Sequence, residues 1–154
     1  MKIDFTKKEF RLLIDLLQIA DWVMHSNSID MPEETKPYWE LEQKIFSFAE
    51  KIGLGNLITR EIDQEEYLPT QEYEKNSPYM NFIEEFENDS FWDSLIHRLA
   101  MRDLFKKEGK DRVDNMSTTE YFEKLVTFEQ RYQEEFESHG ISRLDIDNFG
   151  EGHE

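Results

Sequence analysis

The spacing of apolar residues from Thr6 to Met24 predicts one long amphipathic helix. At about 100° per residue, its apolar side chains cover an arc of roughly 220°, about twice the stripe of a surface helix. Thr6 and Glu9 have the Thr-x-x-Glu spacing of a capping box, and Ser117 and Glu120 repeat the pattern before the last predicted helix. Because so wide an arc needs neighbours on more than one side, we expect the first helix to be central in the fold.

Helical spacing and end signals recur in four later segments. Thr35 and Pro37 open the second helix, and Gly53 follows its last apolar residue. Ser77 precedes a short helix, and the run Asn88-Asp89-Ser90 is expected to end that helix and cap the next. The short connection between the first two helices favours antiparallel packing. The five expected helices span about 6–24, 35–52, 78–87, 91–108 and 118–138.

The chain between the second and third predicted helices has a different character. From Asn56 to Asn76 the apolar residues show no sustained period, so we expect an irregular connection with about one helical turn. Residues 61–89 hold ten acidic residues against a single base, Lys75. This stretch is predicted to form the most acidic surface of the protein.

These elements predict an all-α fold, a single-domain bundle of four long helices plus one short helix. The first helix is central, and the irregular acidic connection lies between helices 2 and 3. We expect the domain to span residues 1–146, with 147–154 as a flexible C-terminal tail. A chain of 154 residues is long enough to bury its own core.

Composition narrows the expected partners. The chain has 18 Lys and Arg against 35 Asp and Glu, a net charge of −17, which repels nucleic acid and anionic membranes. It contains no cysteine, which fits a reducing compartment. The N-terminal residues lack the apolar stretch of a signal peptide, and no run reaches the ~18 apolar residues of a membrane span. We therefore expect a soluble cytoplasmic protein that binds neither nucleic acid nor membrane.

Sequence signatures of catalysis are missing. The chain has no G-x-x-x-x-G-K-[ST], G-x-G-x-x-G, H-E-x-x-H or G-x-S-x-G motif, and its six glycines do not cluster. The leading interpretation is a non-catalytic helical protein that acts through protein–protein contacts, without a cofactor. It would serve as a small regulatory or inhibitory partner, or as a homodimer. A weaker alternative is a DNA mimic, in which the acids of residues 61–89 imitate phosphates.

Two Asp–His pairs leave another class of function open. Asp21 and His25 are four residues apart on the first helix, and Asp93 and His97 have the same spacing further along. If the pairs face each other, they could bind zinc or another divalent metal, in a metal-binding bundle or a metal-dependent enzyme. The alternative interpretation is an ordinary helix-surface pair in each case, which contributes about 0.2–0.5 kcal/mol.

Several acids fall on or beside the apolar faces of the predicted helices. These inward acids are Asp21, Glu42, Asp103 and Glu129. They indicate either metal ligands inside a bundle or structural acids held by Arg and Tyr donors. Arg102 and Tyr132 are among the available donors. We expect Asp21 and Asp103 to be structural.

Overall fold

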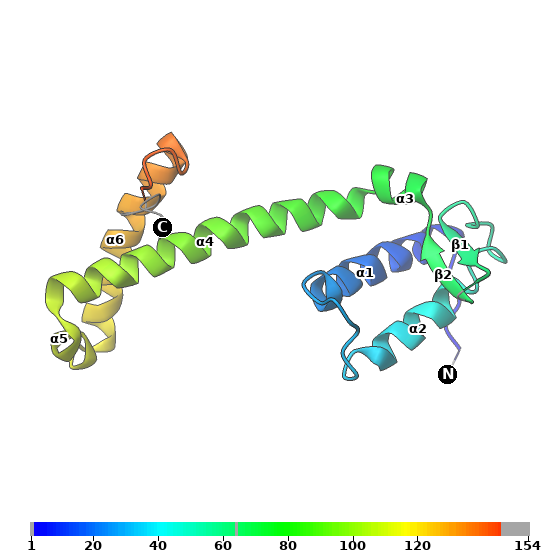
Figure 1. Cartoon of the computed structure of the whole chain (residues 1–154), viewed down its shortest axis with the longest axis horizontal. Coiled ribbons are helices and arrows are strands. Elements are labelled where there is room, and N and C mark those ends of the chain that lie inside the picture. Colours follow the sequence, from blue (N-terminus) through cyan, green and yellow to red (C-terminus); the bar gives the residue numbers. More distant parts are fainter. Residues whose placement is uncertain (1, 64, 146–154) are drawn as a thin grey trace, which may run out of the picture. The chain divides into compact units, whose positions relative to one another are not determined.

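The computed structural model describes residues 2–63 and 65–145, and this part of the chain is mostly helical, as predicted (Figure 1). It contains six helices and one small two-stranded sheet. Backbone contacts divide the chain into two compact units, Met1–Glu87 and Asn88–Glu154. The single domain over 1–146 stays a prediction, and the predicted tail, 147–154, lies outside the described residues.

Helix α1 (Lys7–His25) begins as the sequence predicts. The Thr6 hydroxyl accepts a hydrogen bond from the Glu9 amide at 3.3 Å, and the Glu9 carboxylate accepts one from the Thr6 amide at 2.8 Å. This completes the capping box and confirms the predicted start. Helices α1 and α2 (Lys36–Phe46) lie side by side and run antiparallel, which confirms the expected packing (Figure 1).

One side of α1 faces the core and the other is open. Phe10 and Ile14 are buried, whereas Leu12, Leu16 and Val23 expose 53%, 63% and 68% of their surface. The expectation that neighbours cover the whole apolar arc is therefore wrong for this unit. Only the side of α1 that carries Phe10 and Ile14 contributes buried residues to the core of this unit, so apolar surface on its other side stays exposed.

Helix α2 ends earlier than its apolar pattern predicts. The predicted helix runs to Ile52, but α2 ends at Phe46, and turns follow. These turns bury Ala49 and Leu54, and the Leu54 amide donates to the Ala49 carbonyl at 2.8 Å. Burial of these side chains in the core stabilises the turns more than continuing the helix would, although the apolar spacing here is helical.

The irregular connection expected over residues 56–76 is wrong in its first half. Strands β1 (Ile58–Glu61) and β2 (Glu66–Pro69) form an antiparallel hairpin. Helix α3 (Gln71–Asn76) then supplies the expected helical turn, with the Thr70 hydroxyl accepting from the Tyr73 amide. Each strand has only four residues, too few to display the two-residue alternation that identifies a strand.

The core of the first unit draws on α1, the end of α2, the hairpin, α3 and the start of α4. Its buried apolar residues are Phe10, Ile14, Phe46, Ala49, Leu54, Leu57, Ile58, Tyr73, Tyr79 and Ile83.

Helix α4 (Pro78–Glu108) is one continuous helix of 31 residues. The predicted break at Asn88-Asp89-Ser90 is wrong, so the expected short helix and the helix after it are one element. These residue types cost about 0.5 kcal/mol each in a helix interior, too little to interrupt it without Gly or Pro. A side-chain bond also spans the position, since Trp92 Nε1 donates to Asn88 Oδ1 at 3.2 Å.

The second unit folds around the later part of α4. Helix α5 (Lys110–Asp114), which the sequence did not predict, follows Gly109 and precedes α6 (Thr118–His139). The positive φ of Gly109, 83°, allows the chain to turn there. Ser117 caps α6 as predicted, but the Glu120 carboxylate pairs with Arg112 at 2.6 Å, so only half of the second capping box forms. The buried core of this unit contains Ala100, Leu104, Val113 and Leu125.

Candidate functional site

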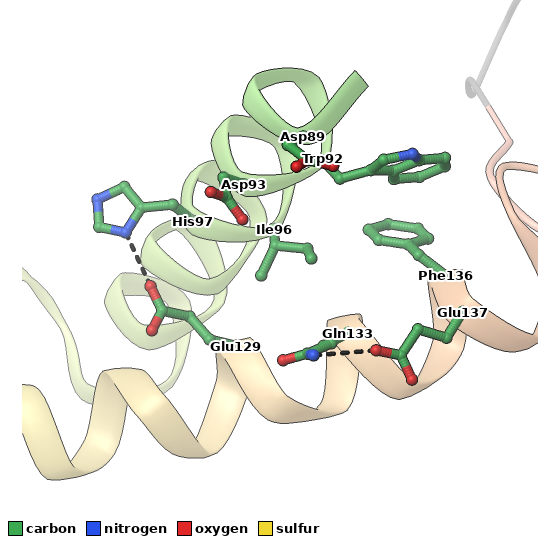
Figure 2. Close-up of a pocket in the computed structure, with 9 residues that line it drawn as sticks. All are labelled: Asp89, Trp92, Asp93, Ile96, His97, Glu129, Gln133, Phe136 and Glu137. Atoms are coloured by element: carbon green, nitrogen blue, oxygen red, sulfur yellow. Dashed lines mark hydrogen bonds and ion pairs between the residues drawn. The ribbon is translucent and has the colours of Figure 1, made fainter. Parts of the chain in front are cut away.

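A groove of about 670 Å³ lies between α4 and α6 in the second unit (Figure 2). Its floor is apolar, formed by Trp92 and Ile96 from α4 and Phe136 from α6. Acidic side chains stand around this floor. The acids that line the groove are Asp89, Asp93, Glu129 and Glu137.

The aromatic floor is held by packing within the unit. Phe136 is buried, with 7% of its surface exposed. Its ring lies 5.4 Å from the Trp92 ring and 5.8 Å from the Tyr132 ring, centroid to centroid. Trp92 is partly exposed and tied to Asn88 through its indole nitrogen. The floor is therefore fixed in position yet accessible to an apolar group.

The carboxylates around the groove differ in the hydrogen bonds that they make within the chain. His97 Nδ1 contacts Glu129 Oε1 at 2.9 Å, and Gln133 Nε2 donates to Glu137 Oε1 at 2.9 Å. Asp93 makes no hydrogen bond or ion pair with the described part of the chain (Figure 2). Carboxylate oxygens therefore remain available to a cation, beside apolar surface that could take an aliphatic chain.

The four predicted metal residues are distributed over both units. Asp21 and His25 lie in the first unit, where Asp21 Oδ1 contacts His25 Nδ1 at 2.7 Å. His25 Nε2 contacts the Thr35 hydroxyl at 2.7 Å, so both ring nitrogens are engaged and tie α1 to the start of α2. Asp93 and His97 lie in the second unit, where His97 pairs with Glu129.

Among residues 2–63 and 65–145, no three His, Asp or Glu side chains gather in a group that could hold a metal ion. A divalent-metal site at Asp21, His25, Asp93 and His97 stays a prediction.

The inward acids have the following partners. Asp103 accepts from Arg102 Nε at 2.8 Å and from the Tyr132 hydroxyl, so its predicted structural pairing is confirmed. The bond from Arg102 lowers the pKa of Asp103 below its usual value. Asp21 meets His25 instead of the Arg or Tyr partner that we expected, and Glu129 meets His97.

Glu42 is the most deeply buried of these acids, with 7% of its surface exposed. Gln18 Nε2 donates to its carboxylate at 3.1 Å. Burial raises the pKa of Glu42 to about 7, and the nearby charge of Asp21 adds to the effect.

Sequence reasoning missed the role of Asp15 of α1. Asp15 Oδ1 accepts from the Tyr73 hydroxyl at 2.5 Å and from the Ser77 hydroxyl at 3.2 Å. Burial raises the pKa of the Tyr73 hydroxyl, and the bond to Asp15 adds to the effect. These partners lie more than 50 residues away, and no local spacing could indicate them.

The first unit carries an open apolar face on α1 and α2. On α1 its exposed residues are Leu12, Leu16 and Val23. Ile19, partly buried against the core, completes the spacing of four, three and four residues that is typical of a coiled-coil seam. At about 100° per residue, Asp21 lies on the opposite side of α1 from this stripe, and Asp15 lies about 40° from Ile19, where it accepts a hydrogen bond from the Tyr73 hydroxyl. Tyr38 and Leu41 of α2 are exposed as well, and both line a small pocket with Ala20 of α1. We name the set Leu12, Leu16, Ile19, Ala20, Val23, Tyr38 and Leu41 the α1–α2 face.

Comparison of the chain with family models, curated proteins and solved structures finds no match. Among the described residues, no helix is long and apolar enough to cross a membrane.

Proposed function

We propose that this protein is non-catalytic and acts through protein–protein contacts, with the α1–α2 face joining two copies of the chain. The observation that carries the proposal is the exposure of that face. Leu16 and Val23 expose 63% and 68% of their surface, and Tyr38 exposes 60%. Monomers rarely present contiguous apolar patches above a few hundred Å², because burying apolar surface is favourable by about 25 cal/mol per Å².

The geometry of the face suits a second copy. Two antiparallel helices from each chain, packed through a heptad-spaced seam, would form a four-helix bundle between chains. The four-helix architecture expected from the sequence would then belong to the pair. Helices of 19 and 11 residues are about 45 Å long in total, so at a width of about 10 Å they cover a flat area of about 450 Å² per copy. Specific interfaces begin near 600 Å² per partner, so a dimer at the weaker end is expected.

The net charge opposes self-association, so a second copy is expected only at a face that is poor in acids. Two chains of −17 each repel, and only a surface without acids lets them approach closely. The residues of the α1–α2 face are themselves uncharged, and the nearest acids, Asp21 and Glu42, line the pocket beside Tyr38 and Leu41. Salt screens the repulsion between exposed charges beyond ~8 Å at physiological ionic strength, so self-association should strengthen as salt is added.

Sedimentation velocity tests the proposal. The wild-type chain should dimerise at micromolar concentration, and Leu16→Glu should shift it to monomer by placing a charge in the seam. Ile62→Glu is the matched control, because Ile62 is 82% exposed in the hairpin turn and the change adds the same charge in the same unit. A wild-type monomer at about 200 µM, or dimers of equal strength in both variants, would overturn the proposal.

A further inference from the structure

We propose that the groove between α4 and α6 binds a basic amphipathic segment of another protein. The inference rests on the proposed role in protein contacts and names the chemistry of a second partner. It uses a surface in the second unit, so it does not depend on self-association through the α1–α2 face.

The acids around the groove are arranged at a cost to the fold. Asp89 and Asp93 are one turn apart on α4, a like-charge spacing that destabilises a helix. Glu137 stands across the groove on α6, and no lysine or arginine is among the described lining residues (Figure 2). Because Asp93 has no partner within the described chain, its charge is left for an external cation.

The apolar floor restricts which kind of cationic ligand is complementary to the groove. A bare ion would satisfy the carboxylates but would leave Trp92, Ile96 and Phe136 uncovered. An apolar chain without charge would cover the floor but would leave the carboxylates unpaired. A peptide segment with aliphatic side chains on one face and Lys or Arg beside them matches both features, and the stems of Lys and Arg add apolar cover.

The length of the groove indicates a short helical segment. Asp89 to His97 spans eight residue steps of α4, about 12 Å, or slightly more than two turns. A partner helix of similar length would place apolar anchors at i, i+3 or i+4, and i+7 over the floor. Its basic residues would then lie beside Asp93 and Glu137.

Fluorescence anisotropy of a labelled peptide tests the proposal on the full chain. The probe is a capped peptide of about 14 residues, with leucine at helical spacing and lysine elsewhere. A lysine-only peptide of equal length and spermine are the comparison ligands. We expect the leucine–lysine peptide to bind at least about tenfold more tightly than either, and its binding to weaken as salt rises.

Paired variants locate the binding. Asp93→Asn with Glu137→Gln should weaken the peptide about tenfold. Asp111→Asn with Glu123→Gln removes the same charge from exposed positions of the same unit outside the groove, and should change binding less than twofold.

Four outcomes would overturn the groove proposal: equal effects of the two double variants, equal binding of the lysine-only peptide, equal binding of spermine, or no peptide binding at all. A change of oligomeric state in the groove variant alone would assign the groove to a second copy and also overturn it. The four binding outcomes do not bear on the Leu16→Glu test. If the groove variant changes the oligomeric state, sedimentation of Leu16→Glu still shows whether the α1–α2 face joins the copies, so the two proposals fail separately.

Discussion

The side chain of Gln43 completes the backbone hydrogen bonding of Tyr67. Gln43 Oε1 accepts from the Tyr67 amide at 2.7 Å, and Gln43 Nε2 donates to the Tyr67 carbonyl at 3.0 Å. One amide on α2 thus serves both polar groups of a β2 residue, as a neighbouring strand would. This contact joins the hairpin to α2 and explains how two strands of four residues are held in place.

Gln43→Ala should therefore destabilise the first unit. Both backbone groups of Tyr67 are part-buried in these bonds, and unsatisfied buried polar groups cost about 1–3 kcal/mol. We expect a loss of that size in the free energy of unfolding, measured by urea denaturation. Gln71→Ala, an exposed glutamine at the start of α3, is the control and should lose less than about 0.5 kcal/mol. Equal losses would show that the contact contributes nothing specific.

Glu42 should make the protein less stable as pH rises. Its pKa is about 7 in the folded chain against an ordinary 4.5, because burial disfavours the charged form. Between pH 4.5 and 7 the folded state holds a proton that the unfolded state has released, so stability falls as pH rises through this window and levels off above it. The total loss is about 3 kcal/mol.

Glu42→Gln tests this pH dependence. The variant should gain up to about 3 kcal/mol at pH 8 and almost nothing at pH 4, where the wild-type carboxyl is already neutral. Glu50→Gln, at an exposed position just after α2, corrects for the general effect of removing one negative charge. A gain that is the same at both pH values would contradict the assigned cause.

Local sequence patterns are sufficient to predict some elements of this fold and insufficient for others. The Thr6–Glu9 capping box and the start of α6 after Ser117 depend on residues three positions apart, so the sequence predicts them. The hairpin depends on Gln43, which is 24 residues from Tyr67. The continuity of α4 depends on summed helix propensity, which a single cap-type residue such as Asn88 does not outweigh.

The candidate site was likewise only partly predictable from the sequence. Asp93 and His97 were singled out by their spacing, and both line the groove. The floor could not be predicted, because Trp92 and Phe136 meet only after α5 turns the chain, and that short helix gave no signal. His97 likewise pairs with Glu129, 32 residues away, instead of with its helical neighbour.

Ser90→Pro distinguishes one helix from two at the predicted break. In a continuous α4, proline at this position removes a backbone hydrogen bond and clashes with the preceding turn, which costs about 3 kcal/mol. At the cap of a separate helix over residues 91–108, proline would be tolerated, because no helical hydrogen bond would be lost there. We expect the larger loss, seen as lower helicity by circular dichroism and a lower melting temperature. Thr118→Pro, at the first position of α6, is the matched control and should change stability little.

Tyr132→Phe should show how much the hydrogen-bonded cluster of Arg102, Asp103 and Tyr132 contributes to the stability of the second unit. The Tyr132 hydroxyl donates to Asp103 and accepts from Arg102 at 3.0 Å, so removing it leaves both partners one bond short. We expect a loss of about 1–3 kcal/mol in the free energy of unfolding near neutral pH. Tyr67→Phe, whose hydroxyl makes no hydrogen bond in residues 2–63 and 65–145, should lose much less.

The pH dependence of the Tyr132→Phe effect identifies the responsible partner. Bonds from Arg102 and Tyr132 lower the pKa of Asp103, so its stabilising contribution is complete above the ordinary value near 3.8 and is lost as pH falls through the folded value. The cost of Tyr132→Phe should therefore be greater at pH 7 than at pH 2, in urea titrations at both values. A cost independent of pH would mean that the hydroxyl acts through packing alone, because a bond to a carboxylate must weaken when that carboxylate is protonated.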